Sequence, residues 1–170
     1  MAKVLMVVAP SNFRDEEYQK PKMVLENAGY QVVTASKGVQ VAKGMLGATA
    51  NIEQDIAGVN VSDFVALVFV GGSGASIYFN DQKVLALAKE AVFQGKVVGA
   101  ICIAPSILAN AELLMRKNAT SFSSEAENLK AKGALFTGQA VTVDGKIVTA
   151  NGPEAAEEFG QKLVEVLKRS

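Results

Sequence analysis

The residue with the clearest chemical potential is Cys102, which follows an apolar, β-branched run and precedes a predicted helix with Pro105 in its first turn. Small residues, Ala100 and Ala104, stand two positions before and two positions after it. This pattern is typical of a nucleophile elbow, a tight strand-to-helix turn that presents a nucleophile at the end of a sheet. A helix N-terminus there would favour the thiolate. The alternative is a small buried hydrophobic residue, the usual role of a free cysteine.

Two other segments carry residues that could serve a reactive thiol. A Gly-Gly-Ser-Gly loop at 71–74 follows the most apolar segment, and its backbone N–H groups could approach a developing oxyanion. A plain tight turn is the alternative, and a phosphate loop is disfavoured because no Gly-Lys-Ser/Thr follows. Glu17 lies in the first turn of a predicted helix, where an acid usually only interacts with the helix dipole. Beside a thiol its pKa would rise, so that it could shuttle a proton. Asp15 and Glu16 are competing candidates.

The composition excludes several classes of function. The chain has no histidine, whereas serine and cysteine hydrolases normally need a histidine base and zinc sites normally need histidine or several cysteines. We therefore expect no metal site. Seventeen basic and 17 acidic residues balance, so the charge predicts no nucleic acid or membrane partner. No segment approaches the roughly 18 apolar residues that a membrane span needs. A single cysteine forbids an intrachain disulfide and predicts a reducing, cytoplasmic location.

Strands and helices alternate along most of the chain and must position these residues. The apolar runs predict buried strands at 3–9, 30–35, 64–70 and 97–102. Helical segments are predicted at 15–27, 81–94 and 105–111 and after Pro153, and Pro21 is expected to kink or divide the first of them. A chain of 170 residues of this kind predicts one α/β domain, a three-layer sandwich with a mostly parallel central sheet and helices on both faces.

The remaining segments predict smaller elements. Residues 38–61 lack a helical period and predict short strands or loops, and a short strand is expected at 119–122. Ser124 is expected to cap a helix that ends at Gly133, with Glu127 as its capping-box partner. Residues 140–150 predict an antiparallel hairpin with an Asp-Gly turn.

Several motifs follow one another along the chain. They are Phe13-Arg14-Asp15-Glu16-Glu17, Val70-Gly71-Gly72, Ala100-Ile101-Cys102 with Pro105, Ala119-Thr120-Ser121, Val143-Asp144-Gly145-Lys146 and Thr149-Ala150-Asn151-Gly152-Pro153. Together they resemble the ThiJ/PfpI (DJ-1/PfpI) superfamily, whose fold is flavodoxin-like and related to class I glutamine amidotransferase domains. The resemblance covers nearly the whole chain, so it implies a single ThiJ/PfpI domain over residues 1–170.

The resemblance implies a role for each candidate residue. Cys102 corresponds to the elbow cysteine, and Glu17 to the glutamate that hydrogen-bonds its thiol. Gly72 and Ile103 correspond to the positions whose backbone N–H groups form the oxyanion pocket, with Gly71 beside them. Members of the superfamily are mostly homodimers, and some form hexamers, so we expect a homodimer or a larger homo-oligomer.

The sequence departs from the superfamily at three positions. Ile103 stands where the protease-like branch has histidine, Phe122 stands near the position where the human-like branch has histidine, and Val70 replaces a frequent proline. These departures disfavour a PfpI-type cysteine peptidase or amidase. The resemblance instead implies a stress-protection protein with cofactor-free glyoxalase or deglycase activity on small aldehydes such as methylglyoxal, through Cys102 and Glu17. The alternative is a non-enzymatic oxidative-stress sensor or chaperone that acts through oxidation of Cys102.

Overall fold

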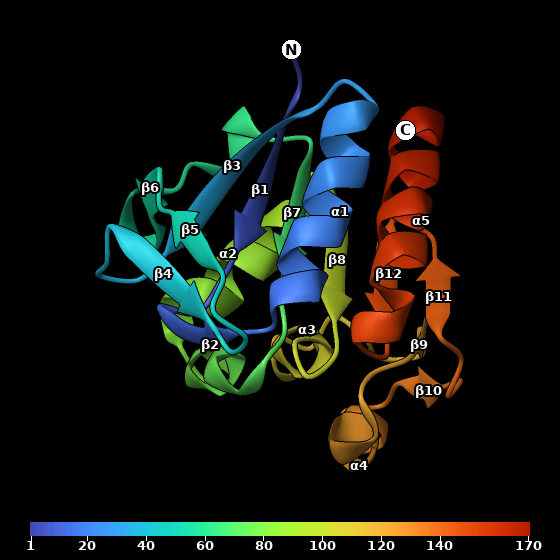
Figure 1. Cartoon of the computed structure of the whole chain (residues 1–170). Coiled ribbons are helices and arrows are strands. Elements are labelled where there is room, and N and C mark those ends of the chain that lie inside the picture. The colour runs from blue at the N-terminus through green and yellow to red at the C-terminus, as the bar shows by residue number, and fades with distance from the viewer.

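The computed structural model describes all residues 1–170, and a seven-stranded sheet runs through its centre (Figure 1). The strands of this sheet are β1 (Lys3–Val7), β3 (Gln31–Ser36), β6 (Gln54–Asp55), β7 (Ala66–Phe69), β8 (Val97–Ile101), β11 (Val141–Asp144) and β12 (Ile147–Ala150). Their spatial order is β11-β12-β8-β7-β1-β3-β6. Every neighbouring pair is parallel except β11 with β12. The predicted α/β fold with a mostly parallel sheet is therefore confirmed.

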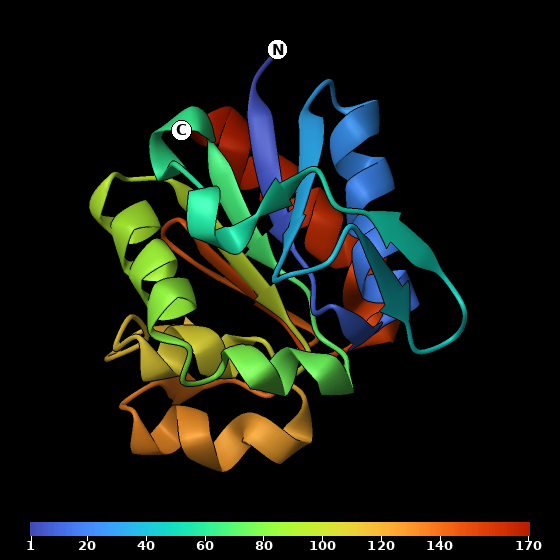
Figure 2. The ribbon, with the colours of Figure 1, turned by 90° about the vertical axis from the view of Figure 1, so that its left-hand side faces the viewer.

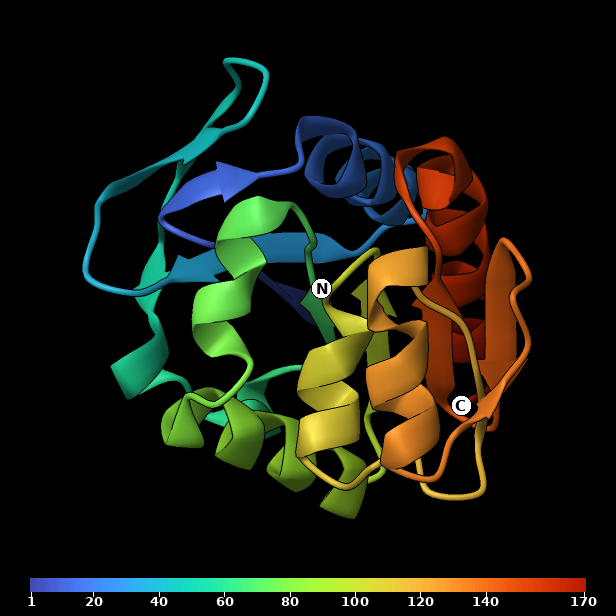
Figure 3. The ribbon, with the colours of Figure 1, turned by 90° about the horizontal axis from the view of Figure 1, so that it is seen from below.

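Helices cover both faces of this sheet, as Figure 2 shows. The helices are α1 (Asp15–Asn27), α2 (Gln82–Phe93), α3 (Pro105–Asn110), α4 (Ala126–Ala131) and α5 (Ala156–Arg169). Helices α1 and α5 pack side by side on one face, and α2 lies on the other face. Seen from below, α3 and α4 lie side by side across the carboxyl edge of the sheet (Figure 3).

The strands bury side chains on both faces because each face has its own helix layer. Along β1, Leu5 and Val7 belong to the core shared with α2 and α3, whereas Val4 and Met6 belong to the core shared with α1 and α5. Strands buried on both faces are continuous apolar runs, and this explains the pattern seen in the sequence. On β8, the lack of a side chain at Gly99 lets α5 pack closely on the sheet. A Cβ atom there would lie only 2.8 Å from Leu163 Cδ2.

The segment 38–61 forms short strands and turns, as predicted. A small second sheet contains β2 (Ser11–Phe13), β4 (Val41–Gly44) and β5 (Thr49–Asn51). The β4–β5 hairpin projects from the body of the molecule (Figure 3). Two short 3-10 helices, η1 (Ile56–Gly58) and η2 (Val61–Asp63), then lead back to the main sheet.

Two predicted details of the helices are wrong. Helix α1 continues through Pro21 and is not divided; Pro21 is buried against α5, where a Cβ atom on Gly160 would lie 3.0 Å from its Cα. Ser124 does not cap a helix, because a 3-10 turn, η4 (Ser123–Glu125), precedes α4. Its hydroxyl donates to Glu125 Oε2 (2.8 Å) instead, and Glu127 forms an ion pair with Lys130 (3.6 Å), so no capping box forms.

Two predicted strand details also change. The strand expected at 119–122 is only β9 (Asn118–Ala119), paired with β10 (Leu135–Phe136). The hairpin of β11 and β12 is confirmed, but Asp144 pairs with Ile147, so the two turn residues are Gly145 and Lys146. The positive φ of 59° at Gly145 explains why glycine is needed there.

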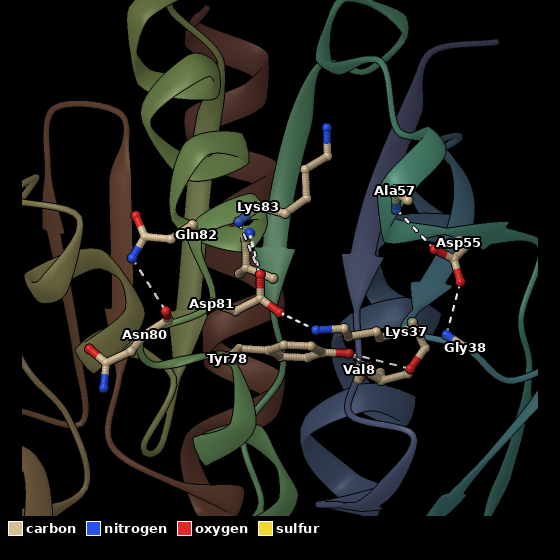
Figure 4. A network of polar contacts seen from close by, with 12 residues as sticks. Val8, Lys37, Gly38, Asp55, Ala57, Tyr78, Asn80, Asp81, Gln82 and Lys83 are labelled. Atoms are coloured by element: carbon tan, nitrogen blue, oxygen red, sulfur yellow. Dashed lines mark hydrogen bonds and ion pairs between the residues drawn. The ribbon is translucent and has the colours of Figure 1, made fainter.

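A polar network fixes the segment that follows the glycine loop, η3 (Ser73–Tyr78), against the ends of β1 and β3 (Figure 4). The buried Tyr78 hydroxyl donates to the backbone oxygen of Val8 (2.9 Å), and burial raises the pKa of Tyr78 to about 12. Lys37 forms an ion pair with Asp81 (2.7 Å), which also accepts hydrogen bonds from the first turn of α2. The loop after β7 is thereby held in one position.

Candidate active site

Three neighbouring strands deliver the candidate residues to one edge of the sheet. Strand β7 lies between β1 and β8. Glu17 follows β1 through β2 and the start of α1, Gly71 and Gly72 follow β7, and Cys102 follows β8. Figure 3 looks onto this edge. Ligands of open α/β sheets bind at the carboxyl ends of the strands, so this edge is where a site is expected.

Cys102 occupies the strained turn expected of an elbow. Its φ is 64°, a left-handed conformation that is costly for a residue other than glycine. Two hydrogen bonds hold the turn: the N–H of Cys102 donates to the oxygen of Ala150 (2.9 Å), and its carbonyl accepts from the N–H of Phe122 (2.8 Å). Helix α3 begins three residues later with Pro105. The side chain is buried, with 9% exposure.

Gly71 and Gly72 lie so close to neighbouring atoms that neither position has room for a side chain. A Cβ atom on Gly71 would collide with a carboxyl oxygen of Glu17 and would lie 2.6 Å from Cys102 Cβ. Gly72 has a φ of 100°, and a Cβ atom there would collide with the backbone N of Arg14. The N–H of Arg14 donates to the oxygen of Gly71 (2.9 Å). The glycine loop therefore packs directly between the thiol and the start of α1.

The three acids at the start of α1 have different partners. Asp15 accepts from two backbone N–H groups of the β4–β5 turn, at 3.0 and 2.8 Å. Glu16 forms a two-bond ion pair with Arg14, at 2.9 and 3.1 Å. Glu17 is fully buried beside Cys102, and neither of its carboxyl oxygens is matched with a well-aligned hydrogen-bond donor. Of the three acids, only Glu17 is placed to exchange a proton with the thiol.

Burial dominates the electrostatics of this pair. It raises the pKa of Glu17 to about 7, although the neighbouring thiol, the Arg14 charge and the Gly71 N–H oppose the rise. Burial, followed by repulsion from the Glu17 carboxylate, raises the pKa of Cys102 to about 12. The N–H of Ile103, just before α3, does favour the thiolate as expected, but burial outweighs it. A proton on Glu17 removes the repulsion from the carboxylate and so lowers the pKa of the thiol.

The backbone N–H groups of Gly72 and Ile103 lie near the sulfur, and their interaction with it lowers the pKa of Cys102. They lie where the resemblance places the oxyanion pocket. Gly71 has a different partner, because its N–H is directed at the Glu17 carboxyl. Apolar side chains, the half-buried Ile103 and the exposed Phe122, stand at or near the two positions where the resemblance implies histidine in other branches.

One charged residue beside the site was not selected from the sequence. Arg14 precedes Glu17 by three residues, and its carbonyl accepts the Glu17 N–H (3.1 Å). Arg14 is the extended N-cap residue of α1, and its place immediately before the acidic first turn was the available signal. The guanidinium has five N–H donors and uses two of them on Glu16, so three remain available. Its positive charge lowers the pKa of Glu17.

The described chain contains no group of three or more residues suited to hold a metal ion, and none of its helices is long and apolar enough to cross a membrane. A model of the DJ-1/PfpI family matches residues 2–166. The chain belongs to this family.

Similar proteins fall into several named groups. The crystal structure of a ThiJ/PfpI domain protein from Brachyspira murdochii superimposes with a TM-score of 0.97 at 35% identity, covering 99% of this chain and 97% of that chain. The Bacillus subtilis protein named "Putative cysteine protease YraA" is 34% identical and is matched over 99% of this chain and 100% of its own length. The Escherichia coli "Protein/nucleic acid deglycase 2" is 29% identical, over 98% of this chain and 99% of its own.

Proposed function

We propose that this family member converts reactive 2-oxoaldehydes such as methylglyoxal into hydroxyacids without a cofactor, and that deglycation uses the same site. The observation that carries the proposal is the buried Glu17 carboxyl beside the Cys102 thiol, with a pKa of about 7. General acid–base catalysis is most effective when the pKa lies near the working pH. The name of the Escherichia coli relative supports the same class of chemistry.

Each step of the proposed reaction has a group to perform it. The Glu17 carboxylate accepts the Cys102 proton, and the thiolate forms a C–S bond to the aldehyde carbon. The N–H groups of Gly72 and Ile103 stabilise the resulting oxyanion, which then takes up a proton to give the hemithioacetal.

Glu17 next moves a proton from the former aldehyde carbon to the neighbouring carbon, through an enediol. This transfer gives a thioester, which water hydrolyses to lactate with release of the thiol. The aldehyde carbon is oxidised and the ketone carbon is reduced, so that methylglyoxal and water give lactate with no external oxidant.

The test is lactate formation from methylglyoxal by the wild type, Cys102→Ala and Glu17→Gln. Lactate is the proper readout, because the 17 Lys and Arg side chains consume methylglyoxal stoichiometrically without forming lactate. Glu26→Gln is the matched control, since this acid lies on the same helix and is paired with Lys22 on the surface. We expect turnover in the wild type and the control, and its loss by at least about 100-fold in both site variants. Wild-type protein without turnover would refute the proposal.

An oxidation sensor is the second candidate. The N–H groups near the sulfur would also hold the oxygens of an oxidised Cys102. Because peroxide also oxidises the five methionines, sulfinate at the single cysteine, Cys102, is identified by peptide mass mapping and not by whole-protein mass. Stoichiometric sulfinate after peroxide treatment, without lactate formation, would favour the sensor. Peptide hydrolysis would favour the protease class named for the Bacillus subtilis relative, and we expect none because the chain has no histidine base.

A further inference from the structure

A cavity of about 510 Å³ lies on the β12 side of the candidate active site and has no role in the chemistry described above. It is formed where the segment after β9, the start of α4, strand β10 and the β12–α5 loop meet. We call it the aryl pocket, and its lining is Ser121, Phe122, Ser123, Ala126, Phe136, Gly138, Asn151, Gly152, Pro153 and Glu154.

The wall of the aryl pocket is hydrogen-bonded to the elbow on both sides. The N–H of Phe122 donates to the carbonyl of Cys102 (2.8 Å), and the N–H of Cys102 donates to Ala150, which immediately precedes the pocket residues of the β12–α5 loop. Strand β12 pairs with β8 so that Ala150 lies opposite Ile101. A Cβ atom on Gly152 would be 4.0 Å from the Phe122 ring, so this ring lies over the same loop. The aryl pocket is therefore joined to the Cys102 elbow by main-chain hydrogen bonds, directly at Phe122 and through Ala150 on the β12 side.

Three of the ten lining residues are hydrophobic, Phe122, Ala126 and Phe136, and none of the others is basic, so the pocket favours a neutral group that packs on its two rings. Phe122 and Phe136 present two rings, and Phe122 is 45% exposed. The charges nearby offer no recognition of an ionic substituent. Lys130 lies 5.6 Å from the centre of the Phe136 ring and is paired with Glu127. Glu154 is exposed and disfavours an anionic group. In other proteins an apolar cavity of about 150 Å³ holds a benzene molecule, so this volume is ample.

We propose that the aryl pocket receives the apolar substituent of an aldehyde bound at Cys102, so that the chain prefers aryl 2-oxoaldehydes such as phenylglyoxal to methylglyoxal. The preference for turnover rests on the proposed function, whereas occupancy of the pocket does not. Phenylglyoxal and water would give mandelate by the same reaction, in which the aldehyde carbon is oxidised and the ketone carbon is reduced. Phe122, near a position where the resemblance implies histidine in another branch, is a specificity-determining residue in this proposal.

The test measures how fast two electrophiles with the same reactive group alkylate Cys102. Iodoacetamide and N-benzyl iodoacetamide each form a C–S bond with loss of iodide and of the thiol proton, and one differs from the other by a benzyl group. Because the chain has a single cysteine, whole-protein mass reports the reaction at this residue alone. The ratio of the two rate constants is compared with the same ratio for glutathione. We expect the ratio of the benzyl rate constant to the iodoacetamide rate constant to be at least about tenfold higher for the protein than for glutathione.

Two variants locate the preference in the pocket. Phe122→Ala removes one ring, and Ala126→Phe fills the cavity from the half-buried first position of α4. Both should reduce the ratio to the glutathione value while the iodoacetamide rate stays within about twofold, which also shows that the elbow is intact. Phe93→Ala, which truncates a ring that is 86% exposed on α2, should leave the ratio unchanged.

A wild-type ratio equal to that of glutathione would overturn the proposal. A high ratio that survives both pocket variants would overturn it as well, because the benzyl group would then lie elsewhere. A high ratio lost in both variants, together with no lactate or mandelate formation, would refute the proposed function and leave the binding site established. The two failures are therefore distinguishable.

Discussion

Replacing Glu17 by glutamine should make the protein more stable at neutral and alkaline pH while it removes the activity. The carboxyl is fully buried, its pKa is raised to about 7 from the ordinary 4.5, and burial is the main cause. The folded protein therefore holds this proton more tightly than the unfolded chain. The contribution of the protonated Glu17 carboxyl to stability is fully present below pH 4.5 and is lost as the pH rises through 7. Glutamine has nearly the same shape and cannot ionise.

The size of the effect follows from the shift in pKa. One pKa unit corresponds to about 1.4 kcal/mol, so a rise from 4.5 to about 7 corresponds to about 3 kcal/mol between pH 4 and pH 8. The buried amide of glutamine adds a cost of its own, but that cost does not depend on pH. The quantity to compare is therefore the change between the two pH values, not the stability at either one.

Urea unfolding at pH 4, 6 and 8 measures this change directly. The free energy of unfolding of Glu17→Gln, relative to wild type, should increase by about 2–3 kcal/mol from pH 4 to pH 8. The adjacent Glu16→Gln is a control of opposite sign, because hydrogen bonding to Arg14 lowers the pKa of Glu16. Its stabilising contribution is present above the ordinary carboxyl pKa and is lost as the pH falls.

The reasoning fails if the stability difference between wild type and Glu17→Gln is the same at all three pH values. That result would mean that the carboxyl ionises in the folded protein as readily as in the unfolded chain, and a proton shuttle near pH 7 would lose its basis. A difference that decreased toward pH 8 would refute it equally.

Three further predictions test the surroundings of the site. Gly71→Ala should destabilise the fold by about 1–3 kcal/mol in urea unfolding and slow thiol alkylation, because its Cβ would collide with the Glu17 carboxyl; Gly58→Ala, with open space around it, should change neither measurement. Arg14→Gln should shift the acidic limb of the pH–rate profile to higher pH, because the Arg14 guanidinium lowers the pKa of Glu17 in the wild type. An unchanged profile would contradict this role. Asp15→Asn should lower the free energy of unfolding by about 1–2 kcal/mol by weakening two hydrogen bonds to the β4–β5 turn, and hydrogen exchange at that turn should increase.

The sheet could be predicted because its signal is local. Strands buried on both faces appear as uninterrupted apolar runs, and the tight turn at Cys102 requires small neighbours whatever the rest of the chain does. The helix cap expected at Ser124 could not be settled by a local pattern. Ser124 and Glu127 match the capping-box sequence, but the structure forms a 3-10 turn before α4 instead.

The site itself depended on long-range contacts that no local pattern contains. Spacing alone left the three consecutive acids equivalent, and only the family resemblance singled out Glu17. In the structure Asp15 and Glu17 contact distant segments, whereas Glu16 pairs with the neighbouring Arg14. The raised pKa of Cys102 was not predicted, because the helix terminus was visible in the sequence whereas the extent of burial, which outweighs it, was not. The aryl pocket could not be anticipated, because it forms only where the stretches 121–126, 136–138 and 151–154 fold against one another.

The order of strands in the sheet has a consequence for how the protein folds. The central strand β1 pairs with β3 and with β7, and β8 pairs with β12, so several ladders join distant parts of the chain. Parallel pairing between distant segments is slow to form, because the loop between them must first be ordered. Until β7, β8 and α1 meet, the folding chain carries an ordinary thiol and an ordinary glutamate. The raised pKa of Glu17 is therefore acquired late in folding, and an unfinished chain should react with electrophiles through a thiol that the native protein keeps buried.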